Sequence, residues 1–214
     1  MARIDFKWDE PKLDLYNGGN PDNLLSSLPK SYDESDKPIL VFVTSDLPDD
    51  EQKMKNVESS VFRDESISIG ATLFSNIKMN GLKITDANPY KKMLGGKDLP
   101  RMVVVDTNGQ KVGSVEGQDI SASKVFGLMR KAAAKTFKTD LDTVVKETKT
   151  ILTEIDQVEA KRTALATKKE KSTVAKEAEW AKEAKELDEA MKAIESREAA
   201  LKKKWAEDRK VTKA

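Results

Sequence analysis

Three acids follow closely on the most apolar run of the chain, and their position makes them the first candidates for a functional site. Residues 38–44 are almost all aliphatic, β-branched or aromatic, and Asp49, Asp50 and Glu51 come shortly after them. Acids gathered there could bind a cation or a basic partner peptide. Acids also stabilise the first turn of a helix, where the macrodipole favours negative charge, and we favour this interpretation.

Two absences from the composition exclude most catalytic chemistry. The 214-residue chain has no cysteine and no histidine. Disulfides, thiolate nucleophiles and thiolate metal sites are therefore excluded, and the commonest general base and metal ligand is missing. Carboxylate, lysine, serine or tyrosine chemistry remains, but the sequence holds no Gly-rich phosphate loop, nucleophile elbow or calcium-binding loop. We predict that the protein is not an enzyme and has no catalytic residue, cofactor or metal.

The elements that would position the three acids alternate between strand and helix. The apolar run at 38–44 predicts a central strand covered on both faces. A helix is expected to begin near Pro48, because proline is favoured at the first helical position. Further along the chain, the sequence predicts strands at 77–84, 102–106 and 111–116, a short helix at 89–93 and a closing helix at 121–134.

Two glycines mark irregular positions in the predicted strands. Gly81 breaks the alternation of its strand, as a β-bulge would. Asn108-Gly109 separates two apolar strands, and both residues tolerate the positive φ that a type I′ turn requires. The last two strands should therefore form an antiparallel hairpin.

The chain from about residue 36 to 134 resembles the thioredoxin fold in the order and punctuation of these elements. The resemblance rests on the strand at 38–44, the polar turn and helix start at 45–51, Pro100 before the strand at 102–106, and the Asn108-Gly109 hairpin closed by Gly117. It implies an α/β three-layer sandwich with a mixed sheet. The redox motif of that family, Trp-Cys-x-x-Cys, aligns with Leu47, Pro48, Asp49, Asp50 and Glu51.

Both redox cysteines of the family are thus replaced here, by Pro48 and Glu51. The resemblance implies a cis peptide bond before Pro100 and, beside it, a loop that binds peptides in the family. It does not imply redox activity, because a thiol–disulfide exchanger needs thiols. Whether the Pro100 loop still binds peptides is left open by the sequence.

A second region begins where glycine and proline stop. Residues 128–214 contain neither, and they hold 22 Lys/Arg against 17 Asp/Glu. Glycine and proline cost a helix interior about 1 and 3 kcal/mol, so a stretch free of both predicts sustained helix. We predict an N-terminal extension at 1–35 that packs on the head, a thioredoxin-like head at 36–134, a kink at 135–138 and a helical tail at 139–214.

The tail carries two apolar seams with alternating steps of three and four residues, as in a coiled coil. Thr139 is predicted to cap its first helix. The seams are separated by fifteen residues, one more than two heptads, and are therefore out of phase. Their members are Leu141, Val144, Ile151, Ile155, Val158 and Leu165, and then Trp180, Leu187, Met191, Ile194, Leu201 and Trp205.

Two geometries fit the seams. Equal lengths favour a helical hairpin, whereas the lysines and glutamates between the seams, without Gly, Asn or Pro, favour one helix of about 105 Å, at 1.5 Å per residue. We favour the continuous helix. In either case an exposed apolar stripe demands a covering surface: a second copy, the other half of the hairpin or a foreign protein. We favour self-association, and expect a homo-oligomer or a larger assembly.

From these features we predict a redox-inactive thioredoxin-like module, assembled through a coiled-coil tail as an adaptor or subunit of a larger complex. The first alternative is a peptide-binding chaperone or a carboxylate-based enzyme acting at the former redox site. The second is a tail that binds RNA, the ribosome or an anionic membrane surface. We expect no transmembrane segment. We also expect the protein to be cytoplasmic, or periplasmic or exported if a leader was removed before Met1.

Overall fold

The computed structural model describes residues 4, 7–11, 20–84, 88, 90–171 and 176–209. The described residues form two compact units, one that extends to Val144 and one that covers Val145–Arg209. The boundary lies inside a helix, a few residues after the kink predicted at 135–138.

A four-stranded mixed sheet forms the centre of the first unit. Strands β1 (Ile39–Thr44), β2 (Ser75–Asn80), β3 (Arg101–Val105) and β4 (Lys111–Glu116) lie in the order β2-β1-β3-β4. β1 pairs with β2 in parallel, while β3 is antiparallel to both β1 and β4. All six residues of β1 are buried, as the unbroken apolar run predicts for a central strand.

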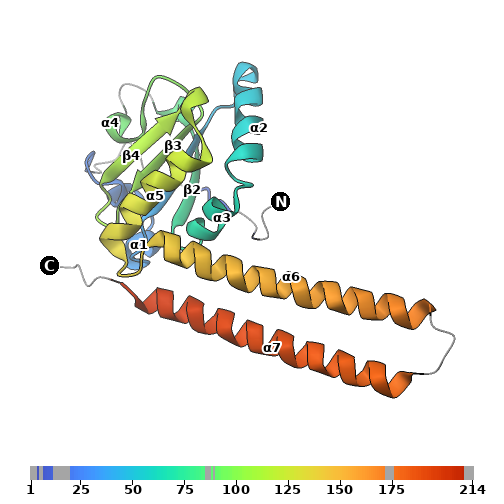
Figure 1. Ribbon diagram of the computed structural model, residues 1–214. Helices are drawn as coiled ribbons and strands as arrows, with labels where there is room; N and C mark the ends of the chain where they lie inside the picture. Colours follow the sequence, from blue (N-terminus) through green and yellow to red (C-terminus); the bar gives the residue numbers. More distant parts are fainter. Residues whose placement is uncertain are drawn as a thin grey trace. The chain divides into compact units, whose positions relative to one another are not determined.

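Helices cover both faces of this sheet and complete the predicted three-layer sandwich (Figure 1). On one face, α2 (Glu51–Ser60), α3 (Glu65–Ala71) and α5 (Ala122–Thr136) pack against Leu40 and Phe42. On the other, the short elements η1 (Leu24–Ser27), α1 (Lys30–Glu34) and α4 (Lys91–Leu94) pack against Ile39, Val41 and Val43. Alternate residues of β1 therefore supply two separate cores.

Segment 7–11 pairs with the sheet at one isolated bridge, and Trp8 packs on Phe42 of β1 with the ring centroids 5.5 Å apart. Asp9 forms a parallel bridge with Ile77, in which the Asp9 amide donates to the Asn76 carbonyl at 2.9 Å and the Lys78 amide donates to the Asp9 carbonyl at 2.8 Å. The outer edge of β2 is thus partly covered.

The bulge predicted at Gly81 is wrong, because β2 ends one residue earlier. The Asn80 side chain accepts a hydrogen bond from the Leu82 amide at 2.9 Å, and this cap starts a 3-10 turn, η3 (Gly81–Lys83). Asparagine favours such local side-chain to backbone bonds, which compete with strand pairing.

The predicted type I′ turn between β3 and β4 is also wrong. Among the described non-glycine residues only Asp36 has a positive φ, so Asn108 does not meet the requirement of that turn. The Gly109 amide donates to the Asp106 carbonyl at 2.9 Å, and Gly109 has a φ of 75°. This is a type I turn followed by a left-handed glycine. The Asp106 carboxylate stabilises it by accepting from the amides of Asn108 and Gln110 at 3.1 and 3.0 Å.

The second unit is a helical hairpin, and the continuous helix that the sequence favoured is wrong. Helix α6 (Leu141–Lys171) and helix α7 (Glu177–Glu207) run antiparallel, side by side (Figure 1). Two ion pairs join them, Arg162–Asp188 at 2.5 Å and Arg197–Glu154 at 2.7 Å. Residues 172–175, which connect the two helices in the sequence, lie outside the described residues.

The hairpin buries the two seams against each other. Its core consists of Ile151, Val158, Leu165, Leu187, Met191 and Ile194. Because each helix covers the apolar stripe of the other, the phase difference between the seams needs no adjustment of a supercoil. Arg162 occupies the seam position between Val158 and Leu165, and its side chain pairs with Asp188 of α7.

The first turn of α6 belongs to the first unit. Leu141 packs in the same core as α5, and Val144 is buried in that unit. Asp140, not Thr139, caps α6, since its carboxylate accepts from the Thr143 amide at 2.8 Å and from the Thr143 hydroxyl at 2.9 Å.

Candidate functional site

The loop that aligns with the family's redox motif leads from β1 into α2. Leu47 precedes a single 3-10 turn, η2 (Pro48–Asp50), in which proline occupies the first position. Asp49 is exposed, whereas Asp50 is buried. The three predicted acids therefore do not form one cluster with shared surroundings.

Asp50 and Glu51 are each paired with a lysine about one turn further along α2. Asp50 accepts from Lys53 at 2.7 Å, and exposed Glu51 pairs with Lys55 at 2.6 Å. Hydrogen bonds from Lys53 and then Ser45 lower the pKa of Asp50, and the bond to Asp50 raises the pKa of Lys53. Both shifts move the groups away from neutral pH, which is the reverse of what general acid–base catalysis requires.

The loop before β3 lies against this helix start. The Leu99–Pro100 peptide bond is cis, at the position where the resemblance implies one. Leu99 packs beside Gly81, since a Cβ added to Gly81 would come within 2.6 Å of a Leu99 methyl group. Asp98 lies near enough to Lys53 to contribute to the raised pKa of that lysine. The β1–α2 loop, η3 and the Pro100 loop therefore meet at one edge of the sheet.

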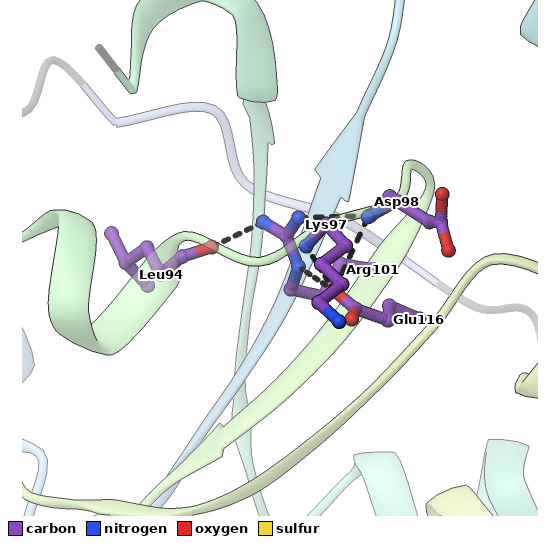
Figure 2. A network of polar contacts seen from close by, with 5 residues as sticks. All are labelled: Leu94, Lys97, Asp98, Arg101 and Glu116. Carbon is purple, nitrogen blue, oxygen red and sulfur yellow. Dashed lines mark hydrogen bonds and ion pairs between the residues drawn. The ribbon is translucent and has the colours of Figure 1, made fainter. Parts of the chain in front are cut away.

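An ion pair between buried Arg101 and partly exposed Glu116 holds the backbone that leads to Pro100 (Figure 2). The Arg101 guanidinium is 4% exposed and donates to Glu116 at 3.0 Å, to the Leu94 carbonyl at 2.5 Å and to the Asp98 carbonyl at 2.8 Å. Glu116 in turn accepts from the Lys97 and Asp98 amides at 3.1 and 3.5 Å. The two side chains thus hold the backbone of residues 94–98 from both sides.

Two leucines are exposed at the same edge. Among the described residues, the exposed large hydrophobic side chains are Leu47, at 48%, and Leu82, at 46%. They follow the paired ends of β1 and β2, where Thr44 lies opposite Asn80. The side-chain amide nitrogen of Asn80 donates to the Asp46 carboxylate, and its side-chain oxygen accepts from the Leu82 backbone amide. We call the exposed residues of this edge the loop surface: Leu47, Asp49, Leu82, Asp98 and the partly exposed Leu99.

The chain is similar to a few solved structures at low sequence identity. No protein-family profile matches the chain, and no curated protein matches it. Among solved structures, a thioredoxin from Thermus thermophilus is 14% identical over 46% of this chain and 75% of its own, with a TM-score of 0.36. A DsbH oxidoreductase is 10% identical over 63% of this chain and 94% of its own, with a TM-score of 0.37.

The mixed sheet, the helices on both its faces and the cis peptide bond before Pro100 were implied by the resemblance, and they are present. The first unit has a thioredoxin-like fold. The chain has no cysteine. In the loop where the family has its dithiol, this unit has the Asp50–Lys53 ion pair.

Acid is expected to weaken the thioredoxin-like unit through Glu116. Partial burial alone would raise the pKa of Glu116, but hydrogen bonds from Arg101 and from the amides of Asp98 and Lys97 outweigh burial and lower the pKa below its ordinary value of 4.5. A carboxylate with a lowered folded-state pKa stabilises the protein above its unfolded-state pKa, and this contribution is lost as the pH falls through the folded-state pKa. The stability lost below pH 4.5 should therefore shrink when Glu116 is replaced by glutamine.

The measurement is urea unfolding at pH 6, 4 and 3, followed by circular dichroism. Glu116→Gln should be less stable than the unaltered protein at pH 6, and the difference should narrow at pH 3. Glu58→Gln, at an exposed position of α2, serves as the control. A constant difference at all three pH values would contradict the assignment.

The residues of the predicted assembly seam separate into two groups. Leu141 and Val144 belong to the thioredoxin-like unit, and the others lie on the hairpin. Ile155, Trp180 and Leu201 are partly buried beside the hairpin core, and Trp205 is buried. Within the described residues no helix is both long and apolar enough to cross a membrane, and no three acids come together as a metal site would need.

Proposed function

We propose that the protein is a non-enzymatic interaction protein whose thioredoxin-like unit binds a partner polypeptide at the loop surface. The observation that carries the proposal is the position of the two exposed leucines, Leu47 and Leu82, at the same edge of the sheet. Single exposed apolar residues are ordinary on protein surfaces. Two that are held by one hydrogen-bonded link, through Asp46 and Asn80, form a fixed apolar contact area.

The charge around the leucines indicates the chemistry of the partner. Asp46, Asp49 and Asp98 are all exposed beside them, and the nearby Lys53 is already paired with Asp50. Acids around an apolar centre favour a partner with basic residues around apolar ones, because complementary charges speed association and reject wrong partners. The partner we propose is therefore a segment with an apolar residue flanked by lysine or arginine.

Catalysis at the same place is less well supported. The sequence lacks cysteine and histidine, and the paired charges of Asp50 and Lys53 keep one group ionised and the other protonated near neutral pH. The surface offers contact and charge rather than a group ready to exchange a proton.

The hairpin would then act as the second assembly element. The apolar side chains of the two helices pack against each other in the hairpin core. A partner of the hairpin would therefore bind its polar outer faces. Those faces carry lysine–glutamate pairs one turn apart, including Lys182–Glu186 and Lys185–Glu189. This arrangement supports an adaptor with two distinct contact surfaces in one chain.

Selection from a random dodecapeptide library on the whole protein tests the proposal. Enriched peptides should carry an apolar residue next to lysine or arginine. In the double variant Leu47→Ser, Leu82→Ser their affinity should fall at least about tenfold, which corresponds to 1.4 kcal/mol. The control changes two exposed lysines elsewhere, Lys131→Ser and Lys138→Ser. Peptides that bind the leucine variant as well as the unaltered protein would contradict the proposal.

A further inference from the structure

A cavity of about 390 Å³ lies in the thioredoxin-like unit, away from the loop surface. The chain before η1 supplies Pro21 and Asp22 to its wall, α4 supplies Lys92 and Met93, and the start of β4 supplies Gln110 and Lys111. Pockets for small molecules usually measure about 300–1,000 Å³. The size of this cavity is thus in the range that a small ligand needs.

The cavity and the loop surface lie at opposite ends of the sheet. Lys111 pairs with Val105, which itself lies opposite Ile39 at the start of β1. Arg101, at the other end of β3, lies opposite Val43, where β1 runs into the loop surface. A ligand in the cavity would therefore not compete directly with a partner on the loop surface.

Lys111 has no direct ion-pair partner among the described residues. Among the described residues no carboxylate lies within ion-pair distance of Lys111, while Lys92 is paired with Asp22 at 3.7 Å. Lys111 is partly buried, and burial lowers its pKa, as does the nearby Arg101, while Glu116 acts in the opposite direction. Burying a charge is costly unless it has a partner of opposite sign.

The remaining lining provides apolar contact and a polar amide. Met93 is buried, while Pro21 and Gln110 are exposed. We propose that this cavity binds a small organic anion, whose apolar body lies against Pro21 and Met93 and whose acidic group contacts Lys111. The ligand class comprises carboxylates, sulfonates and phosphate esters that carry an apolar group.

Two fluorescent dyes that differ in charge test the proposal on the whole protein. Anilinonaphthalenesulfonate has an apolar body and a sulfonate, and phenylnaphthylamine has the same aromatic skeleton without the sulfonate. The sulfonated dye should bind saturably, and Lys111→Met should weaken its binding by about tenfold. Binding of the neutral dye should change less than twofold, because methionine keeps the apolar contact and removes only the charge.

The control variant is Lys131→Met, which removes an exposed lysine of α5 and should leave both affinities unchanged. Thermal unfolding followed by circular dichroism verifies that each variant is folded. In protein with isotope-labelled methionine methyl groups, the sulfonated dye should shift the Met93 resonance, assigned through Met93→Leu. Unchanged binding in Lys111→Met, absence of saturable binding, or loss of binding in the Leu47→Ser, Leu82→Ser variant would overturn the proposal.

Discussion

Replacing Arg101 with methionine is expected to lower the free energy of unfolding by about 3 kcal/mol, since each buried polar group left without a partner costs about 1–3 kcal/mol. Methionine fills part of the volume of arginine but donates no hydrogen bond. Three groups would lose their partner or part of it: the Glu116 carboxylate, the Leu94 carbonyl and the Asp98 carbonyl. The cost follows from burial, because a buried polar group without a partner cannot turn to water.

The measurement is chemical unfolding of the full chain, followed by circular dichroism, for Arg101→Met and Arg130→Met. Arg130 forms an ion pair of similar length, 2.9 Å with Asp142, but both side chains are more than half exposed. Loss of an exposed pair costs about 0–1 kcal/mol. If the two variants were equally stable, the Arg101–Glu116 pair would not hold the loop as described.

Replacing Ile194 with alanine is expected to open the hairpin. Removal of a buried isoleucine side chain costs about 2–5 kcal/mol. The hairpin core has only six buried apolar side chains among the described residues, so this cost is a large part of its stability. The hairpin is a separate compact unit, so the change should appear there first. Amide hydrogen exchange of peptides from α6 and α7 should accelerate, while exchange in β1 and β3 stays slow.

The control for this experiment is the neighbouring residue. Glu195 is exposed on the same turn of α7, and Glu195→Ala should leave exchange in both helices nearly unchanged. Equal protection in Ile194→Ala and the unaltered protein would show that the seams are covered in another way. A second copy of the chain would be the first alternative, and light scattering would detect it.

The parts of the fold with a strong local signal could be predicted from the sequence. The apolar run at 38–44 forms β1, and its residue types predict a buried strand. Residue types also predict the helix start at Pro48 and the strand at 111–116. Helix α3 was missed because it is buried on nearly every side, from Ile67 to Ala71. Such a helix has no polar face to give it a period, and the remaining signal was Asp64, which caps it through the Ser66 and Ile67 amides.

The candidate site was predictable in its backbone but not in its chemistry. Sequence reasoning placed Leu47–Glu51 and Pro100 in the two loops, yet it assigned interest to the acids and overlooked the leucines. Exposure of Leu47 and Leu82 depends on where neighbouring strands end, and a single sequence does not give that register. Arg101 and Glu116 are fifteen positions apart, and their pairing follows only from the antiparallel alignment of β3 with β4.

The hairpin was missed for a different reason. Local helix preference between the seams favours continuity, and no glycine or proline opposes it. The decision lies in the burial of two apolar stripes against each other, which is a property of the whole tail. Long-range burial outweighs a local preference of a few tenths of a kcal/mol per residue.

The ion pair between Asp50 and Lys53 has a consequence for the conditions under which the loop surface can operate. A dithiol at this place would exist in an oxidised and a reduced form, and its surroundings would decide which one a partner meets. A carboxylate and an ammonium group have no such pair of forms. The loop surface therefore presents the same chemical groups in oxidising and in reducing surroundings, and its charges depend on pH and are screened by salt.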